Sequence, residues 1–191
     1  GRKILTSCCN RMKTWSRDDV LTFKEFFSGE DFIKINNFCR RPQWGYGNIS
    51  NPGEPCAPFF TMPLKDEKFF TEYCLNIIQE KLKQKFILND VYANGHIFGT
   101  QGSPHQDSDL DEDFTLLLYS NLIGRDIKKW NPSWGGKTVF YMNRDDLHYV
   151  LPRPNTVSYF PAKMFHYAES TTRHFQGMRI SVAWKLTSDS R

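Results

Sequence analysis

Two histidines and one aspartate have the residue types and the spacing of a metal-binding triad. His105 and Asp107 flank a single residue, and His166 lies much later, just after a segment with the pattern of a buried strand. Residues i and i+2 of a strand point to the same side, so His105 and Asp107 can converge on one point. Two imidazoles and one carboxylate form the facial triad that leaves positions open on a non-haem Fe(II) ion. Ordinary surface or core histidines are the alternative, because His-x-Asp alone is a common pattern.

Arg179 and Ser181 have the spacing of an anion clamp. They share one face of a predicted strand whose other face is apolar. A guanidinium that points into a barrel is costly unless it pairs with an anion, and its parallel N–H groups match a carboxylate. A metal site beside such a clamp suits a keto-diacid that chelates the metal. A solvent-facing Arg179 is the alternative that the pattern leaves open.

The second half of the chain has the pattern of short strands. Val, Ile, Phe, Tyr and Thr are frequent in it, and turn sequences rich in Gly, Pro and Asn separate the apolar segments. Several short strands without helices between them favour an antiparallel sandwich or barrel. The predicted strands are 86–93, 114–120, 137–142, 155–160 and 178–186.

The first half favours helices. Ser16 and Asp19 have the spacing of a capping box and precede apolar residues at helical spacing as far as Phe27. The same periodicity predicts a short helix over 32–38 and a stronger one over 69–82. We therefore expect a mainly β fold with N-terminal helices packed on one sheet.

An aromatic loop separates the last two predicted helices. Residues 41–58 are rich in Pro, Gly and Asn and lack periodicity, which predicts a loop. A loop of this length in a compact domain is usually functional, so we expect it to cover the site and to contact substrate through Trp44 and Tyr46. Packing of these rings under the helices is the alternative.

Length and composition bound the class of protein. The chain has 191 residues, of which 15% are aromatic, and no apolar run approaches the length of a membrane span. We expect one domain over 1–191, with helical support and the aromatic loop in 1–86 and the β core in 87–191. The five cysteines form no C-x-x-C pair, which argues against a disulfide framework or a structural zinc site. With no secretory signal visible, an intracellular, cytoplasmic protein is expected, although a chain that begins with Gly1 need not be complete.

The order of these motifs resembles that of the Fe(II)- and 2-oxoglutarate-dependent oxygenases, and most closely their prolyl 4-hydroxylase-like branch. The resemblance covers about residues 90–186, roughly half of the chain. It is carried, in order, by His-x-Asp at 105–107, the strand around Tyr119, Trp-Gly-Gly at 134–136, the approach to His166, and Arg-x-Ser at 179–181.

The resemblance implies a double-stranded β-helix, or jelly roll, that holds an iron centre. The implied ligands of Fe(II) are His105, Asp107 and His166, with 2-oxoglutarate and O2 as co-substrates and ascorbate as a candidate reductant. The implied reaction releases succinate and CO2 and hydroxylates an unactivated C–H bond, most typically that of a prolyl residue in a peptide or protein.

The resemblance also implies how 2-oxoglutarate is held. Arg179 would pair with its far carboxylate, and further contacts are expected from Ser181, Tyr119, and Tyr92 or the nearby Asn94. The branch often places this basic residue nearer its last histidine, which makes Arg173 an alternative clamp, although its polar surroundings predict a loop.

Other functions and partners remain open at this point. A non-catalytic jelly-roll binding module is one alternative, and a nucleic-acid demethylase of the same superfamily is another, since Arg173 and Arg179 match an R-x5-R spacing. The net charge of +4 and the isoelectric point of about 8.8 fall short of a nucleic-acid footprint. We therefore expect a peptide, protein or small-molecule substrate, no nucleic-acid partner and no membrane association; the sequence is silent on oligomeric state.

Overall fold

The computed structural model describes residues 13–51, 57–121 and 129–189. The α-helices in this part are α1 (Gly29–Cys39) and α2 (Leu75–Leu82), the latter preceded by a π-helical segment over Phe69–Cys74. The strands are β1 (Leu21–Phe23), β2 (Gly45–Asn48), β3 (Phe59–Pro63), β4 (Phe86–His96), β5 (Asp113–Tyr119), β6 (Thr138–Tyr141), β7 (Leu147–Val150), β8 (Thr156–Pro161), β9 (His166–Ala168) and β10 (Arg179–Ser188).

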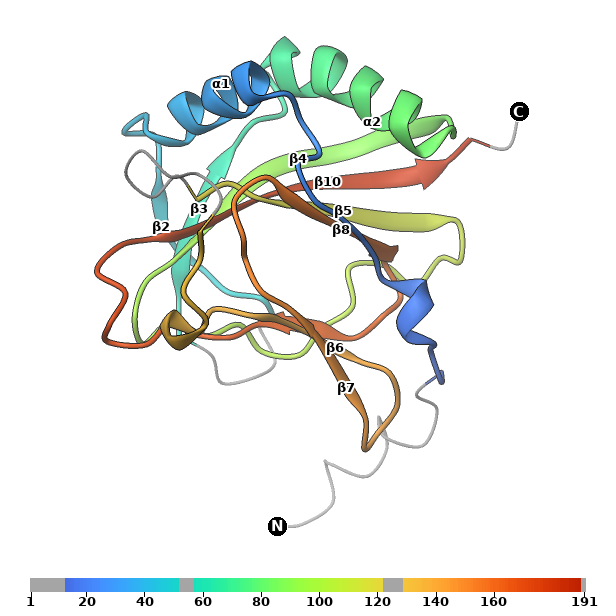
Figure 1. The fold of residues 1–191 in the computed structure, drawn as a ribbon. Coiled ribbons are helices and arrows are strands. Elements are labelled where there is room, and N and C mark those ends of the chain that lie inside the picture. Colours follow the sequence, from blue (N-terminus) through green and yellow to red (C-terminus); the bar gives the residue numbers. More distant parts are fainter. Residues whose placement is uncertain (1–12, 52–56, 122–128, 190–191) are drawn as a thin grey trace.

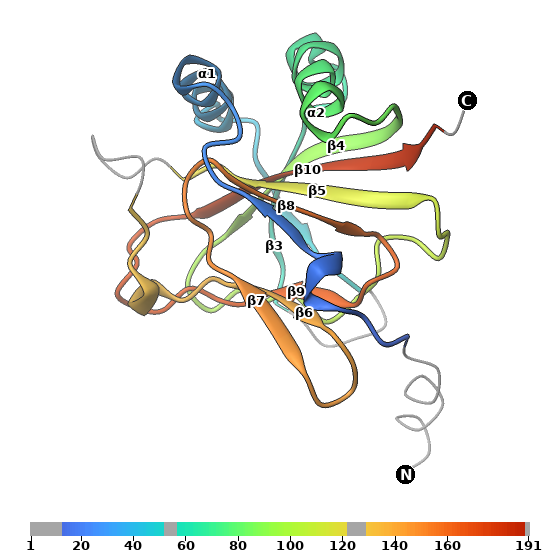
Figure 2. The same cartoon turned by 45° about the vertical axis from the view of Figure 1, so that its right-hand side comes forward.

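The described strands form two antiparallel sheets. The larger sheet has the order β1-β8-β5-β10-β4-β3-β2, and the smaller has the order β7-β6-β9. Figures 1 and 2 show the sheets facing each other, with both α-helices on the outer side of the larger sheet. This arrangement confirms the predicted mainly β fold and leaves an interior between the two sheets.

Strand β10 separates that interior from the outer core. It lies between β4 and β5 and pairs with both along most of its length. Because side chains alternate along a strand, Arg179, Ser181 and Lys185 line the cavity between the sheets. Trp184, on the other face, is fully buried under the helices, where its indole N–H donates to the carbonyl of Phe70 over 3.1 Å.

The helices cover the outer face of the larger sheet with aromatic and aliphatic side chains. Helix α1 begins after Ser28, whose hydroxyl accepts a hydrogen bond from the backbone N–H of Asp31 over 3.1 Å. It buries Phe32, and the second helical segment buries Phe70 and Ile78, in one cluster with the outer face of β10. Neither α-helix in the described part of the chain has the length and apolar character needed to cross a membrane.

The segment after Ser16 differs from its prediction as a helix. The capping box forms, with the backbone N–H of Ser16 donating to the Asp19 carboxylate over 2.7 Å, but it caps a single 3₁₀ turn over Arg17–Asp19. Residues 21–23 then form β1 and pair with β8, so that Leu21 lies opposite Tyr159. Pairing with the edge of the sheet supplies backbone hydrogen bonds that outweigh a local helix preference.

The aromatic segment 41–58 is also more ordered than predicted. It contains β2, which forms an antiparallel pair with β3, while residues 52–56 lie outside the described part. Strands β2, β3, β7 and β9 are only three to five residues long, too short for alternation to reveal them in the sequence.

Candidate metal centre and anion clamp

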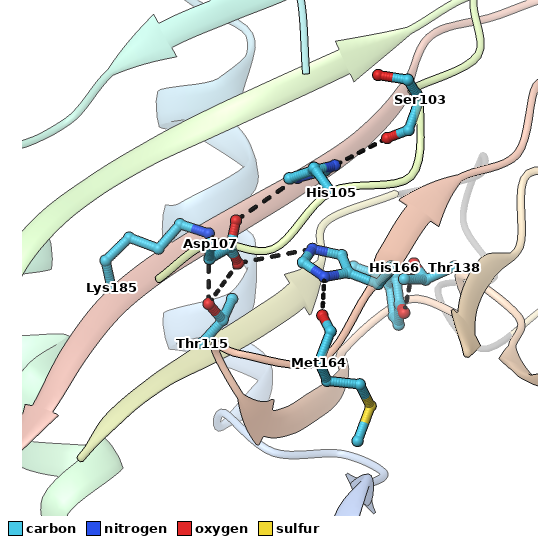
Figure 3. A network of polar contacts seen from close by, with 9 residues as sticks. Ser103, His105, Asp107, Thr115, Thr138, Met164, His166 and Lys185 are labelled. Carbon is cyan, nitrogen blue, oxygen red and sulfur yellow. Dashed lines mark hydrogen bonds and ion pairs between the residues drawn. The ribbon is translucent and has the colours of Figure 1, made fainter. Parts of the chain in front are cut away.

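The structure brings the three predicted metal ligands together. His105 and His166 face each other in an isolated antiparallel bridge, in which each backbone N–H donates to the other residue's carbonyl, over 3.0 and 2.9 Å. The backbone N–H of Asp107 donates to the carbonyl of Ala162 over 2.8 Å, which fixes the aspartate beside them. Nε2 of each histidine lies 3.5 Å from a carboxylate oxygen of Asp107, so the three side chains converge on one point (Figure 3).

Hydrogen bonds orient both imidazoles for metal binding. Nδ1 of His105 lies 2.9 Å from the carbonyl of Ser103, and Nδ1 of His166 lies 2.9 Å from the carbonyl of Met164. A carbonyl accepts only a proton, so each Nδ1 carries a hydrogen, and Nε2 is the nitrogen that each ring turns toward the cavity as a candidate ligand. This donor set, two imidazole nitrogens and one carboxylate, fits a divalent transition metal.

The protonation states of Asp107 and His166 also suit a metal site. Burial alone would raise the pKa of Asp107, but the charge of Lys185 holds it well below its usual range, so the carboxylate is ionised. Burial lowers the pKa of His166 to about 4, which leaves this imidazole neutral near pH 7. The site therefore offers an anionic oxygen and a neutral nitrogen without a competing proton.

Two residues that were not predicted complete the surroundings of Asp107. Lys185 forms an ion pair with Oδ2 of Asp107, and the Thr115 hydroxyl donates to the same oxygen over 2.6 Å. Figure 3 shows both reaching Asp107 from the side of the larger sheet. The alternation that placed Arg179 and Ser181 on the inner face of β10 also places Lys185 there, so the sequence did contain a signal for the lysine.

Arg179 lines another part of the same cavity. It is 1% exposed, and its Nε–H donates to the carbonyl of Gly136 over 2.8 Å. Its terminal N–H groups donate to the hydroxyls of Ser181 and Thr138, over 3.3 and 2.9 Å. Among the described residues no carboxylate forms an ion pair with it, and burial lowers the pKa of its guanidinium. A buried cation without an anion costs several kcal/mol, so this cluster is suited to a ligand carboxylate.

Tyr119 supports the same cluster, whereas Arg173 lies apart from it. The Tyr119 hydroxyl donates to Thr138 over 2.8 Å, and the Arg179 guanidinium lies 5.5 Å from the centre of its ring. Arg173 is exposed in a turn. Burial and contacts therefore favour Arg179 over Arg173 as the clamp.

Strand β4 contributes polar side chains to the cavity next to those of β10, its neighbour in the larger sheet. Tyr92, Asn94 and His96 line the cavity, whose volume is about 640 Å³, and His96 pairs in register with Arg179. Oδ1 of Asn94 and Nδ1 of His96 are buried without a hydrogen-bond partner. Burial, and then the charge of Arg179, lower the pKa of His96 to about 3, so its ring is neutral. His96 had no predicted role; its two-residue spacing from Asn94 was the available signal.

The two predicted substrate contacts lie away from the cavity. Trp44 packs against the outer core, and its indole N–H donates to the carbonyl of Cys39 over 3.0 Å. Tyr46 is 62% exposed, with its ring 4.9 Å from that of Phe60. The described residues of this segment that do line the cavity are Asn48, Ile49 and Ser50.

Comparison with solved structures defines the class of fold. No protein-family model matches the sequence, and no curated protein sequence matches it either. The structure is nevertheless similar over most of its length to solved 2-oxoglutarate- and Fe(II)-dependent oxygenases, which confirms the jelly-roll prediction.

Three of these structures show the extent of the similarity. A prolyl hydroxylase from Trichoplax adhaerens, in complex with a peptide fragment of the hypoxia-inducible factor oxygen degradation domain, superposes with a TM-score of 0.68 at 11% identity, covering 90% of this chain and 84% of that one. A 2-oxoglutarate-Fe(II) oxygenase family oxidoreductase from Burkholderia pseudomallei gives 0.67 at 10% identity, covering 90% and 86%. A prolyl 4-hydroxylase from Pseudomonas putida gives 0.65 at 14% identity, covering 90% and 93%.

Proposed function

We propose that the chain is an oxygenase domain that uses Fe(II) and 2-oxoglutarate to hydroxylate an unactivated C–H bond. The observation that carries this proposal is the combination of two features in one cavity. One is a triad whose two Nε2 atoms and carboxylate point at a common centre. The other is the buried Arg179, which has no anionic partner among the described residues.

Each residue has a distinct task in this proposal. His105, Asp107 and His166 would hold the iron, and Arg179 with Ser181 would bind the far carboxylate of 2-oxoglutarate. The bound iron would supply the oxidising chemistry that couples conversion of 2-oxoglutarate to succinate and CO2 with hydroxylation. The protein orients the reactants and keeps water from the reacting atoms.

The wall formed by β4 would complete the binding of 2-oxoglutarate. Asn94 and His96 each have a buried polar atom without a partner, and such an atom costs about 1–3 kcal/mol unless a ligand satisfies it. His96 lies in register with Arg179, and Asn94 lies in register with Ser181. Both side chains can therefore bond a ligand held by the clamp. Tyr92 lies further along β4, beside Lys185, and remains a candidate contact.

A prolyl residue in a peptide or protein is the substrate that we propose. The support is the Trichoplax prolyl hydroxylase, whose structure contains a peptide. A small molecule would fit the same reaction, and substrate screening separates the two.

Succinate formation tests the proposed reaction. The protein, supplied with Fe(II), 2-oxoglutarate and O2, should form succinate, and His105→Ala and His166→Ala should each abolish it. His174→Ala is the matched control, because His174 is exposed in the segment before β10 and should leave turnover unchanged. Absence of any succinate that depends on His105 and His166 would overturn the proposal.

Mass spectrometry then identifies the substrate class. An oxygen-dependent gain of about 16 Da on proline-containing peptides, and not on their proline-to-alanine versions, is the expected result. The same gain on a free amino acid or another small molecule, or loss of a methyl group from a nucleic acid, would replace the prolyl assignment without affecting the assignment of the iron site.

A further inference from the structure

The two oxygens of Asp107 have different surroundings. Oδ2 accepts hydrogen bonds from Thr115, over 2.6 Å, and from Lys185. Each oxygen also lies 3.5 Å from one nitrogen of the triad, Oδ1 from Nε2 of His105 and Oδ2 from Nε2 of His166. The two oxygens therefore differ in their other partners: Thr115 and Lys185 both contact Oδ2 and leave Oδ1 to the triad.

The ammonium group of Lys185 contacts three neighbouring side chains. It is buried and contacts Asp107, it donates to the Thr115 hydroxyl over 3.3 Å, and it interacts with Tyr92, whose ring centre lies 5.7 Å from Nζ. An ammonium has three N–H groups, so these three neighbours account for all of them. Lys185 thus has no remaining donor for a substrate, although it lines the cavity.

A cation at this position opposes metal binding, so its presence requires another explanation. Lys185 neutralises the carboxylate, which carries the single negative charge of the triad, and its charge repels a divalent ion. A carboxylate without such partners can swing to bind a metal through both oxygens, whereas one held at Oδ2 offers only Oδ1. An oxygenase needs open metal positions for its co-substrate and O2.

We propose that Lys185 is a positioning residue which, with Thr115, holds Oδ2 of Asp107 so that the aspartate binds the metal through Oδ1 alone and a coordination position stays open. This inference rests on the proposed iron site. It extends that proposal by assigning the geometry of the aspartate to two residues that touch neither the metal nor 2-oxoglutarate.

The test uses Mn(II), which reports on its own bound water without turnover. Electron spin-echo measurements in D2O on the Mn(II)-loaded full chain should find fewer metal-bound waters in Lys185→Met than in the wild type, because the freed carboxylate takes a second position. Mn(II) affinity should rise about 10-fold, the scale on which changes in the residues around metal ligands act. Lys185→Arg, which keeps the charge and a donor, should restore the wild-type water count.

Two further variants keep the test decisive. Thr115→Val removes a donor to Oδ2 with little change of shape, so it should reduce the water count even if Lys185→Met does not fold. Lys68→Met removes a lysine from an exposed ion pair with Glu72 on the outer helical segment, and should change neither water count nor affinity.

Kinetics provide a second readout. In Thr115→Val, kcat should fall about 10-fold while the KM for 2-oxoglutarate stays within about 2-fold, because the Arg179 clamp is untouched. Wild-type water count and kcat in Thr115→Val, with Mn(II) still bound by His105 and His166, would overturn the positioning role alone. Failure of the wild type to bind Mn(II) through these histidines would instead overturn the proposed iron site.

Discussion

At the scale of single residues, the candidate site depends on how each polar side chain divides its hydrogen bonds. His105 and His166 use Nδ1 for a backbone carbonyl and present Nε2 to the cavity. Arg179 uses its three nitrogens for Gly136, Ser181 and Thr138, which fixes the guanidinium plane. The identities of these residues follow from sequence motifs, whereas their orientations depend on carbonyls and hydroxyls of distant segments.

The fixed plane of Arg179 makes its replacement by lysine a sharp test. Lys keeps the positive charge but loses the fork that can pair with both oxygens of a carboxylate. In Arg179→Lys the KM for 2-oxoglutarate should rise about 10-fold or more while Mn(II) affinity changes little, since the triad is intact. Initial rates against 2-oxoglutarate concentration, and calorimetry on the Mn(II)-loaded protein, measure the two effects.

Arg173 is the matched control for this experiment. It is exposed in a turn, so Arg173→Lys should leave the KM for 2-oxoglutarate within about 2-fold of the wild type. The reverse pattern, with Arg173→Lys impaired and Arg179→Lys unaffected, would move the clamp to the turn.

At the scale of elements, the pairing of β4 with β10 builds most of the cavity wall. Register places His96 opposite Arg179 and Asn94 opposite Ser181, so each strand supplies alternate side chains to the same interior. His96 is 2% exposed and stacks on Phe59 with ring centres 4.5 Å apart. This pairing buries a neutral imidazole beside a permanent cation.

The burial of His96 gives folding a measurable dependence on pH. Burial, and then the charge of Arg179, lower the pKa of His96 to about 3 in the folded chain, from about 6.5 for an exposed histidine. Below pH 6.5 the unfolded chain therefore binds a proton that the folded chain does not, and the free energy of unfolding falls as the pH falls. Between pH 7.5 and 5.5 this single group should remove about 1 kcal/mol.

His96→Phe isolates this contribution, because phenylalanine preserves the stacking on Phe59 and does not titrate. Urea unfolding at the two pH values should show that the variant loses about 1 kcal/mol less than the wild type on acidification. An equal loss in both proteins would mean that His96 is charged or hydrated in the folded chain.

The elements differ in how well the sequence predicted them, and the reason lies in the range of their contacts. Strand β10 was predicted within two residues at either end, because alternation over its ten residues reports local burial directly. Residues 21–23 were predicted as helix, because their strand depends on pairing with β8 more than a hundred residues later. In the site, the triad and Arg179 follow from ordered motifs, whereas Thr115 and His96 acquire their roles only through packing between strands.

At the scale of the whole molecule, the two faces of the larger sheet serve different purposes. The helices close its outer face with an apolar core, and the smaller sheet faces its inner side across the cavity (Figures 1 and 2). Strands β2 and β3 extend the larger sheet at one edge, and Asn48, Ile49 and Ser50 of this segment line the cavity. The arrangement leaves this edge as the place where a substrate can meet both the cavity and an exposed surface.

Trp44 and Tyr46 allow that role of the edge to be tested, since they lie two residues apart in opposite environments. Tyr46 is 62% exposed and lies two residues before Asn48, which lines the cavity, whereas Trp44 packs against the outer core. If a substrate crosses this edge, Tyr46→Ala should raise the KM for that substrate about 3-fold or more, on the scale of one aromatic contact, and leave the KM for 2-oxoglutarate unchanged.

Trp44→Phe is the control. It removes the hydrogen bond to the carbonyl of Cys39, so it should lower the free energy of unfolding by about 1 kcal/mol and leave both KM values unchanged. A rise in substrate KM in Trp44→Phe, with none in Tyr46→Ala, would place substrate entry elsewhere, because Trp44 is partly buried against the outer core and can affect binding only through the fold.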